Sequence, residues 1–267
     1  MMWKRLFVGL LFIMLASPGH GQTKNQRDAA GRKQGYWEAV DNKGGLVYSG
    51  YFKDDKPVGE MKRYFPTGQL RAIMNYENDG TKARTLFYWQ NGELAARGNY
   101  IGTRRDSVWL YYSYYTKTIS HSVAYAEGKR NGKEQSFYPN GNVAQETIWK
   151  SDLKDGGWKQ FFDGGQLKST AMYVNDKLEG PYTAYYPNGM KEIEGIYRND
   201  APDGEWNRFD DTGKVTSTIK YAKGKITNQD ELSADEQEFF RKVMEQEGRI
   251  KEPTLEDLMR EVQQQNK

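Results

Sequence analysis

A 24-residue period is the feature that most limits what this chain can form. Position 6 of each unit is mostly aromatic, position 10 is usually glycine, and an aromatic residue recurs at or next to position 18. Every interval between units is 24 residues except the fourth, which is 25. The eight units begin at Gly35, Gly59, Ala83, Ser107, Gly132, Gly156, Gly180 and Gly204. A period of this length is typical of repeat proteins, in which each unit is stabilised by its neighbours.

Each unit is predicted to be one β-hairpin. In the stretch YYPNG, which ends at Gly189, proline and asparagine suit the centre of a turn and glycine suits the positive φ that closes a hairpin through a bulge. Aromatic-rich segments flank this turn, as in strands. The turn glycines are Gly44, Gly68, Gly92, Gly141, Gly165, Gly189 and Gly213. The predicted fold is therefore an all-β repeat array over residues 35–226, in which eight stacked 24-residue hairpins form an elongated single-layer antiparallel sheet.

The pattern DKLEGPYTAYYPNG, followed by GIYRND, resembles the MORN repeat and, more closely, its bacterial variant. The resemblance extends from Gly35 to about Ile226. It implies a single-layer β-array that binds proteins or lipids, and some members of the bacterial variant family carry antitoxin-like labels. Three departures stand out: Ala83 and Ser107 replace the leading glycine, Lys191 occupies a position that is leucine in other units, and the fourth unit lacks the turn glycine.

The first 21 residues have the layout of a secretory signal peptide. Lys4 and Arg5 precede an apolar run from Leu6 to Leu15, and small and helix-breaking residues follow. The run is too short to span a bilayer, which takes about 20 residues, although a retained N-terminal anchor is the alternative. We therefore expect an exported protein, periplasmic or at the cell surface, that is not an integral membrane protein once residues 1–21 are removed. Residues 22–34 are expected to form a flexible N-terminal segment.

Residues 227–267 depart from the repeat pattern and are predicted to be a helical C-terminal cap or tail. Ser233 and Glu236 match a capping box at the start of one helix. Thr254 with Asp257 suggests a second, which would carry Leu255, Leu258, Met259 and Val262. The helices could seal the open edge of the last hairpin, as repeat arrays require, or dock a partner.

The composition offers little for catalysis. The chain has no cysteine, and His121 is the single histidine after residue 20, so thiol chemistry and metal sites built on paired histidines are excluded. Paired carboxylates such as Asp54-Asp55 and Asp210-Asp211 fall in predicted turns. We therefore predict no enzyme activity, no catalytic residue, no cofactor and no metal site. The small positive charge lacks the concentrated basic patch of a nucleic-acid binder.

The fourth unit is the candidate partner-binding site. Thr116 and Lys117 replace its glycine turn, and strand alternation would place Trp109, Tyr111 and Tyr115 on one face and Tyr112 and Tyr114 on the other. We predict that Trp109, Tyr111, Tyr112, Tyr114, Tyr115 and His121 contact a partner. The alternative is a diverged repeat whose extra tyrosines fill space. Positions 6 and 7 are both aromatic in several units, so one row is expected in the core and the other on a surface, without indication of which.

The function expected from the sequence is protein binding or scaffolding in the bacterial cell envelope. Carbohydrate or peptidoglycan binding through the tyrosine rows is the alternative, since aromatic rings also stack on sugars. A third possibility, an antitoxin-like partner protein, rests on the family resemblance alone.

Overall fold

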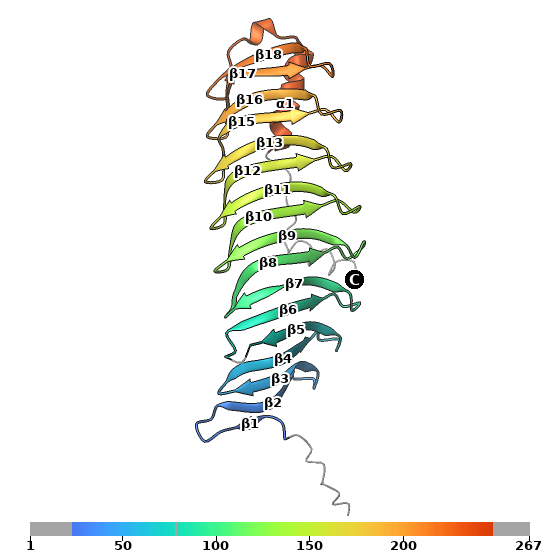
Figure 1. Cartoon of the computed structure of the whole chain (residues 1–267), viewed down its shortest axis with the longest axis vertical. Helices are drawn as coiled ribbons and strands as arrows, with labels where there is room; N and C mark the ends of the chain where they lie inside the picture. Colours follow the sequence, from blue (N-terminus) through green and yellow to red (C-terminus); the bar gives the residue numbers. More distant parts are fainter. Residues whose placement is uncertain (1–22, 78, 248–267) are drawn as a thin grey trace, which may run out of the picture. The chain divides into compact units, whose positions relative to one another are not determined.

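Strand follows strand along almost the whole computed structural model, which describes residues 23–77 and 79–247 (Figure 1). These residues contain nineteen strands, one short 3-10 helix and one α-helix. They fall into two units: unit 1 runs to Leu94 and includes Tyr100–Gly102, and unit 2 consists of Ala95–Asn99 and Thr103 onward. The predicted signal peptide at residues 1–21 and the predicted second helix after Thr254 lie outside the described residues.

Unit 1 is an antiparallel meander. Each of its strands pairs with the next in sequence, from β1 to β6. The strands are β1 (Gln26–Arg27), β2 (Lys33–Val40), β3 (Leu46–Lys53), β4 (Lys56–Tyr64), β5 (Leu70–Tyr76) and β6 (Lys82–Tyr88). The next strand, β7 (Leu94–Ile101), has residues in both units.

Unit 2 continues the same hairpin design and adds the helices. Its strands are β8 (Arg104–Tyr112), β9 (Ile119–Ala126), β10 (Lys129–Phe137), β11 (Val143–Lys150), β12 (Leu153–Phe161), β13 (Leu167–Val174), β14 (Lys177–Leu178), β15 (Gly180–Tyr185), β16 (Lys191–Arg198), β17 (Ala201–Phe209), β18 (Val215–Ala222) and β19 (Lys225–Ile226). The 3-10 helix η1 (Gln229–Glu231) and the helix α1 (Ala234–Glu247) follow. The predicted antiparallel hairpin array is confirmed within each unit.

The hairpin turns have the geometry that their residues favour. The Gly189 amide donates to the Tyr186 carbonyl at 2.9 Å, and the Tyr186 amide donates to the Met190 carbonyl at 2.8 Å. The register shifts between Ala184 and Tyr185, which is a bulge at the end of the strand. All seven turn glycines have φ between 82° and 89°. A Cβ atom would meet nothing within 4 Å at any of them, so backbone conformation rather than space selects glycine there.

A second type of turn joins one hairpin to the next through an aspartate. Asn175 and Asp176 both have positive φ, as a two-residue hairpin turn of type I′ requires. The Asp176 carboxylate accepts a hydrogen bond from the Lys154 amide at 2.6 Å, and the Asp176 amide donates to the Lys154 carbonyl at 2.8 Å. Equivalent carboxylate bonds, from a residue 22 positions earlier, are made by Asp55, Asp152 and Asp200. These turn aspartates therefore bind adjacent hairpins to one another.

The edge strand of unit 2 is shielded by the segment that follows it. β19 pairs with the end of β18, and the Thr227 amide donates to the Lys220 carbonyl at 2.8 Å. Next, the Asn228 side chain accepts from the Lys220 amide at 2.9 Å and donates to the Thr218 carbonyl at 3.1 Å. Residues 225–228 therefore satisfy these backbone groups of β18, and α1 lies elsewhere, on a face of the sheet.

In unit 1, the residues that precede β2 likewise form hydrogen bonds along its edge. The Asn25 amide donates to the Tyr36 carbonyl at 2.9 Å, and its side chain accepts from the Glu38 amide at 2.8 Å. Lys24 also forms an ion pair with Glu38 at 2.6 Å. Residues 22–34 were expected to form a flexible segment; its described part includes β1, which pairs with the start of β2.

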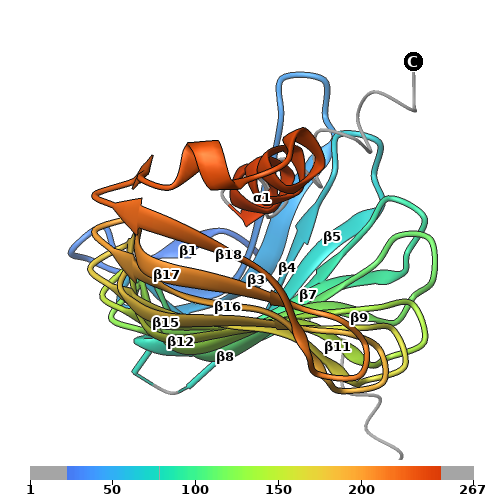
Figure 2. The same ribbon diagram turned by 90° about the horizontal axis from the view of Figure 1, so that it is seen from above.

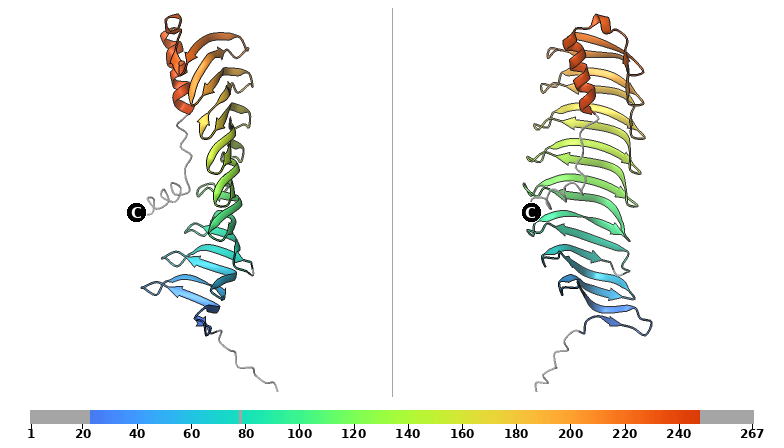
Figure 3. Two further views of the ribbon diagram at one scale, coloured as in Figure 1. Left: turned by 90° about the vertical axis from the view of Figure 1, so that its left-hand side faces the viewer. Right: turned by 180° about the vertical axis from the view of Figure 1, so that it is seen from behind.

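α1 lies along one face of the last strands of unit 2, as two views agree (Figures 2 and 3). We call this the helix-side face. Because strand residues alternate, it carries positions 3, 5, 14, 16 and 18 of each repeat. Its most buried side chains include Trp109, Val123, Thr147, Trp158, Trp206 and Ile219. The opposite face carries mainly polar side chains at its centre, where Gln135 pairs with Glu146 and Lys159 with Thr170.

Candidate binding face of unit 2

Beneath the helix-side face, a tryptophan ring packs directly against a glycine of the preceding repeat. We call this tryptophan–glycine pair the foundation of the face. Trp206 is fully buried, and a Cβ atom added to Gly195 would lie 2.1 Å from its ring. The Trp206 indole donates to the Ile196 carbonyl at 3.2 Å. Trp109 repeats the arrangement over Gly98, with an indole hydrogen bond to the Asn99 carbonyl at 3.0 Å. Glycine is required here by close approach, since no smaller residue exists.

These position-16 glycines were not identified from the sequence. The sequence contained a signal for them, because Gly50, Gly98 and Gly195 each precede a large residue at position 3 of the next unit by eleven residues. In unit 1 a Cβ atom on Gly50 would lie 3.0 Å from Met61, a looser version of the same contact.

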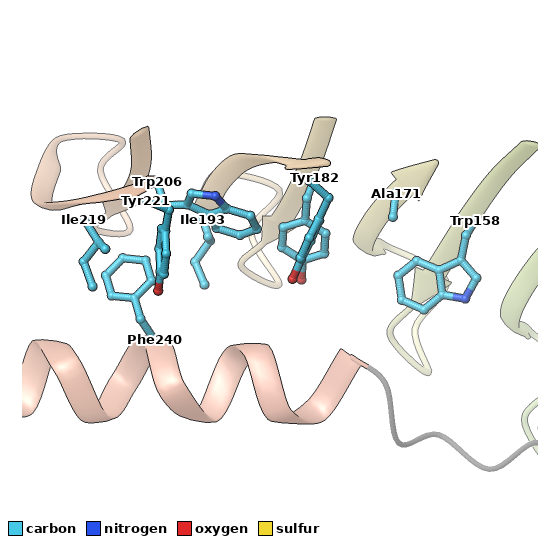
Figure 4. Close-up of a cluster of buried hydrophobic side chains, with 9 residues drawn as sticks. Trp158, Ala171, Tyr182, Ile193, Trp206, Ile219, Tyr221 and Phe240 are labelled. Atoms are coloured by element: carbon cyan, nitrogen blue, oxygen red, sulfur yellow. The ribbon is translucent and has the colours of Figure 1, made fainter. Parts of the chain in front are cut away.

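α1 shows what the helix-side face can hold. Phe240 is fully buried against a cluster that includes Trp206, Ile219 and Tyr221 (Figure 4). Phe239 lies beside it, and the Arg208 guanidinium sits 3.7 Å from the Phe239 ring centroid. The helix therefore docks through one stripe of apolar side chains. Burial in this cluster also raises the pKa of Tyr221.

The start of α1 is fixed by a capping box. Ser233 Oγ accepts from the Glu236 amide at 3.3 Å, while a Glu236 carboxylate oxygen accepts from the Ser233 amide at 2.8 Å and from its hydroxyl at 2.7 Å. These hydrogen bonds, the Ser233 hydroxyl first among them, lower the pKa of Glu236 to about 2. The cap predicted from Ser233 and Glu236 is thus present in the structure.

Next to the α1 dock, the face loses the apolar members of one cross-strand row. One cross-strand row of neighbours crosses unit 2, and at the dock it consists of Ala184, Ile193, Arg208 and Ser217. Earlier in the chain the same row is polar without interruption. This polar row is Tyr111, His121, Ser136, Gln145, Gln160 and Ser169.

Arginine and lysine side chains near the ends of repeats 3 to 5 border the helix-side face. The Arg105 guanidinium lies 5.3 Å from the Trp109 ring centroid, and that of Arg130 lies 3.4 Å from the Trp149 ring. The Lys154 ammonium lies 5.2 Å from the Tyr173 ring. Such cation–π contacts fix the stems of the basic side chains. Arg130 also pairs with Glu134 on the same face at 3.8 Å, so this acid is already matched by a base.

The structure separates the six residues of the sequence-predicted site. Trp109 and Tyr111 are buried and stack on each other with ring centroids 6.3 Å apart, so they belong to the foundation of the face. Strand β8 ends at Tyr112, which is half-buried. Tyr114 and Tyr115 lie in the turn that follows, so strand alternation does not govern them. His121 joins the polar row, and Tyr115, at 65% exposure, is the one fully exposed member.

Neither aromatic row at positions 6 and 7 forms the core. Most of these side chains are half-buried, and the position-7 tyrosines bond to the next repeat. The Tyr138 hydroxyl donates to the Phe161 carbonyl at 2.8 Å, and the Tyr186 hydroxyl donates to the Phe209 carbonyl at the same distance. The rows therefore join neighbouring hairpins. In the described residues, only Tyr51 and Tyr115 are exposed aromatic side chains.

No group of three or more His, Cys, Asp or Glu residues able to hold a metal ion occurs within the described part of the chain. In the same residues, no helix is long and apolar enough to cross a membrane.

Comparison with known proteins identifies the repeat. Four segments match the family described as MORN repeat variant: residues 57–78, 130–151, 154–175 and 178–199. Each matched segment overlaps one of the 24-residue units, which places the family's unit on the hairpins described above. Repeats of this family are typically non-catalytic. No curated protein matches the chain.

Solved structures show only distant similarity. The crystal structure of TcdB2-TccC3-TEV has 10% identity over 73% of this chain, with a TM-score of 0.19. The Photorhabdus luminescens Tc holotoxin pore has 9% identity over 68% of this chain, with the same TM-score. This chain spans only 14% and 12% of those two chains.

A Bacteroides fragilis protein of unknown function has 9% identity over 63% of this chain and 94% of its own, with a TM-score of 0.11. All three TM-scores are too low to bear on fold or function. The family matches at four of the eight hairpin units, together with the 24-residue period, support a MORN-repeat protein.

Proposed function

We propose that this protein is an exported, non-catalytic binding module that holds a segment of a partner protein on the helix-side face of repeats 4 to 6. The observation that carries the proposal is α1 itself. The face already binds an amphipathic helix through Phe240 and the Phe239–Arg208 contact, on the same tryptophan–glycine foundation that repeat 4 presents. The partner segment is expected to be more polar than α1, because it would face the polar row.

A protein ligand suits the described surface better than a glycan. Sugar binding by stacking needs flat aromatic rings open to solvent, yet most rings here are packed against each other, a base or the backbone. The half-buried members of the polar row, His121, Ser136 and Gln160, instead place imidazole, hydroxyl and amide groups on neighbouring strands, which suits hydrogen bonding to an extended or helical peptide.

The cellular part of the proposal places the partner in the bacterial cell envelope. It rests on the signal-like sequence of residues 1–21. Mass spectrometry of the protein purified from its own cells tests it: a mature chain that begins near Gln22 and fractionates with the envelope supports export. A chain that retains Met1 and stays with the cytoplasm contradicts it.

A paired-variant capture experiment tests the binding face. The tagged protein is crosslinked in its own envelope, and attached species are identified by mass spectrometry. In one variant, Ser136→Arg and Gln160→Arg place bulk and charge on the helix-side face. In the matched control, Gln135→Arg and Lys159→Arg alter the adjacent strand residues, which point to the opposite face.

We expect one protein to be captured by the natural chain and the control, and its yield to fall at least tenfold in the Ser136/Gln160 variant. Equal capture by both variants would place the partner elsewhere. Enrichment of glycan fragments without a protein would support the carbohydrate alternative and overturn the proposal.

A further inference from the structure

The end of the hairpin array in unit 2 follows the repeat pattern as far as Thr227 and then departs from it. The Thr227 amide donates to the Lys220 carbonyl at 2.8 Å, as the Glu179 amide donates to the Met172 carbonyl at 3.0 Å in repeat 6. The next residue, Asn228, would be position 1 of a ninth repeat. The chain instead turns into η1, so β18 has no complete strand beside it at this edge.

The Asn228 side chain takes the place of the missing strand. Its Oδ1 accepts from the Lys220 amide at 2.9 Å, and its Nδ2 donates to the Thr218 carbonyl at 3.1 Å. One primary amide thus supplies the acceptor and the donor that a neighbouring strand would supply. Asn228 is buried, at 9% exposure, and Phe240 of α1 lies in the same buried cluster as Ile219 of β18 (Figure 4). The outer edge of β18 and its adjoining face are therefore covered by non-strand residues.

An asparagine caps the edge of unit 1 in the same way. The Asn25 amide donates to the Tyr36 carbonyl at 2.9 Å, and its Oδ1 accepts from the Glu38 amide at 2.8 Å. Asn25 has a φ of 62°, in the left-handed region that asparagine adopts more readily than most residues. In each unit, an asparagine therefore engages outward backbone groups of the strand at the sheet edge.

The sequence of β18 explains why its edge needs a cap. Edge strands are commonly protected by charged side chains or proline, which disfavour the addition of a further strand. The segment Val215–Ile219 has the sequence VTSTI, which contains neither and is mostly β-branched. Both backbone groups of Thr218 point outward, because a residue in an antiparallel strand directs its amide and carbonyl to the same side and Asn228 binds the carbonyl.

A second copy of this chain is the partner that such an edge fits. Two β18 strands related by a two-fold axis run antiparallel, which is the pairing that β18 already has with β17. The same residues face each other in such a pair, and Val215–Ile219 brings no like charges together. An uncapped β18 edge is therefore complementary to itself.

We propose that Asn228 and Asn25 are strand-edge caps that keep second copies of this chain from extending the sheet, and that β18 pairs with the β18 of a second copy once its cap is removed. An uncapped end pairs with its counterpart about a two-fold axis, so the loss of one cap gives a closed dimer. The loss of both caps leaves two open ends on each chain and gives longer assemblies. The inference is independent of the proposed function, because neither edge belongs to the helix-side face of repeats 4 to 6.

Sedimentation velocity of the full chain over a wide range of protein concentration tests the caps. The variants are Asn228→Ala, Asn25→Ala and the two combined, and circular dichroism verifies that each one folds. The matched control is Asn188→Ala, which also removes side-chain hydrogen bonds to the backbone, but in a hairpin turn that is remote from either edge.

A second pair of substitutions tests whether the dimer forms through β18. In the Asn228→Ala background, Thr218→Pro removes the outward backbone donor that a second copy would use. Thr218→Val is the control, because it removes the same hydroxyl, which donates to Asn207 Oδ1 at 2.7 Å, but keeps the amide.

We expect each single-cap variant to form dimers, with self-association at least tenfold tighter than that of the natural chain and of Asn188→Ala. The combined variant should give species larger than a dimer. Thr218→Pro should reverse the association of Asn228→Ala, and Thr218→Val should not. Folded single-cap variants that associate no more tightly than the natural chain would overturn the proposal, and so would an Asn228→Ala dimer that survives Thr218→Pro.

Discussion

Repeats 4 and 8 share the tryptophan–glycine foundation, but the cross-strand rows beside it have different side chains. In both, a buried tryptophan covers a position-16 glycine and its indole donates to a carbonyl ten residues earlier. In repeats 7 and 8 the cross-strand row beside that foundation contains the apolar Ala184 and Ile193 of repeat 7 and the polar Arg208 and Ser217 of repeat 8, and Phe240 of α1 packs in the cluster that includes Ile193. In repeats 4 and 5 the row contains His121, Ser136 and Gln145. The comparison indicates that position 3 and position 16 build the face, while positions 5 and 14 determine what it binds.

Removing the foundation should have the largest effect. Trp206→Ala deletes a fully buried indole that contacts Tyr182, Tyr197 and Tyr221, with ring centroids 5.0 to 6.2 Å away. A large-to-small change at such a site lowers the free energy of unfolding by about 3–5 kcal/mol. Chemical denaturation of the variant and of Trp109→Ala should give losses of similar size. A loss below about 1 kcal/mol at either site would contradict the shared foundation.

The next largest effect is expected from weakening the contact between α1 and the sheet. Phe240→Ala removes the side chain that buries α1, and we expect the free energy of local opening of α1 to fall by roughly 3 kcal/mol. Hydrogen exchange measured by mass spectrometry should show faster exchange in α1 and unchanged exchange in β8 to β11. Global destabilisation of unit 2 instead would mean that α1 is a required part of the sheet's core.

Adding one carbon at position 16 should cost less but test the geometry more sharply. Gly195→Ala places a Cβ atom 2.1 Å from the Trp206 ring, and the necessary shift should lower the free energy of unfolding by about 1–3 kcal/mol. Gly157→Ala is the matched control, because its nearest contact would be Met172 Sδ at 4.0 Å. We expect this control to be close to neutral. Equal losses would show that strand glycines matter here only for backbone entropy.

The smallest effect concerns pH. The pKa of Glu236 is lowered to about 2 in the folded protein, mainly by the Ser233 hydroxyl, from an ordinary value near 4.3. Its contribution to stability is therefore present above about pH 4.5 and is lost as pH falls toward 2. Comparing thermal unfolding at pH 6 and pH 3, we expect Glu236→Gln to shrink the difference slightly. An identical pH dependence in the natural protein and the variant would show that the cap carries no such linkage.

The hairpin fold was predictable from the sequence because its signals are local. Turn glycines such as Gly189, the flanking aromatic positions and the capping box at Ser233 act within a few residues of where they stand. The role of Asp176 was harder to predict, since its hydrogen bond reaches a residue 22 positions away. Aligning the eight repeats and noting where aspartate recurs in the turns would reveal this role.

The candidate site was less predictable because it depends on which positions share a face across strands. The sequence singled out repeat 4, yet Trp109 and Tyr111 proved to be foundation, and Tyr115 lies in a turn. The polar row could have been derived by listing positions 5 and 14 of every unit once the register was known. The position of α1 could not have been derived from the sequence, because an amphipathic helix alone does not specify which surface covers its apolar stripe.

One measurement tests the helix-side face of repeats 4 and 5 most directly, because His121 is the single histidine after residue 20 and lies in the polar row. Modification of His121 by diethylpyrocarbonate is followed in the full chain alone and with the captured partner added. If the partner segment lies on this face, the partner should slow the modification several-fold. Equal rates with and without the partner would contradict the assignment of this face as the partner-binding site.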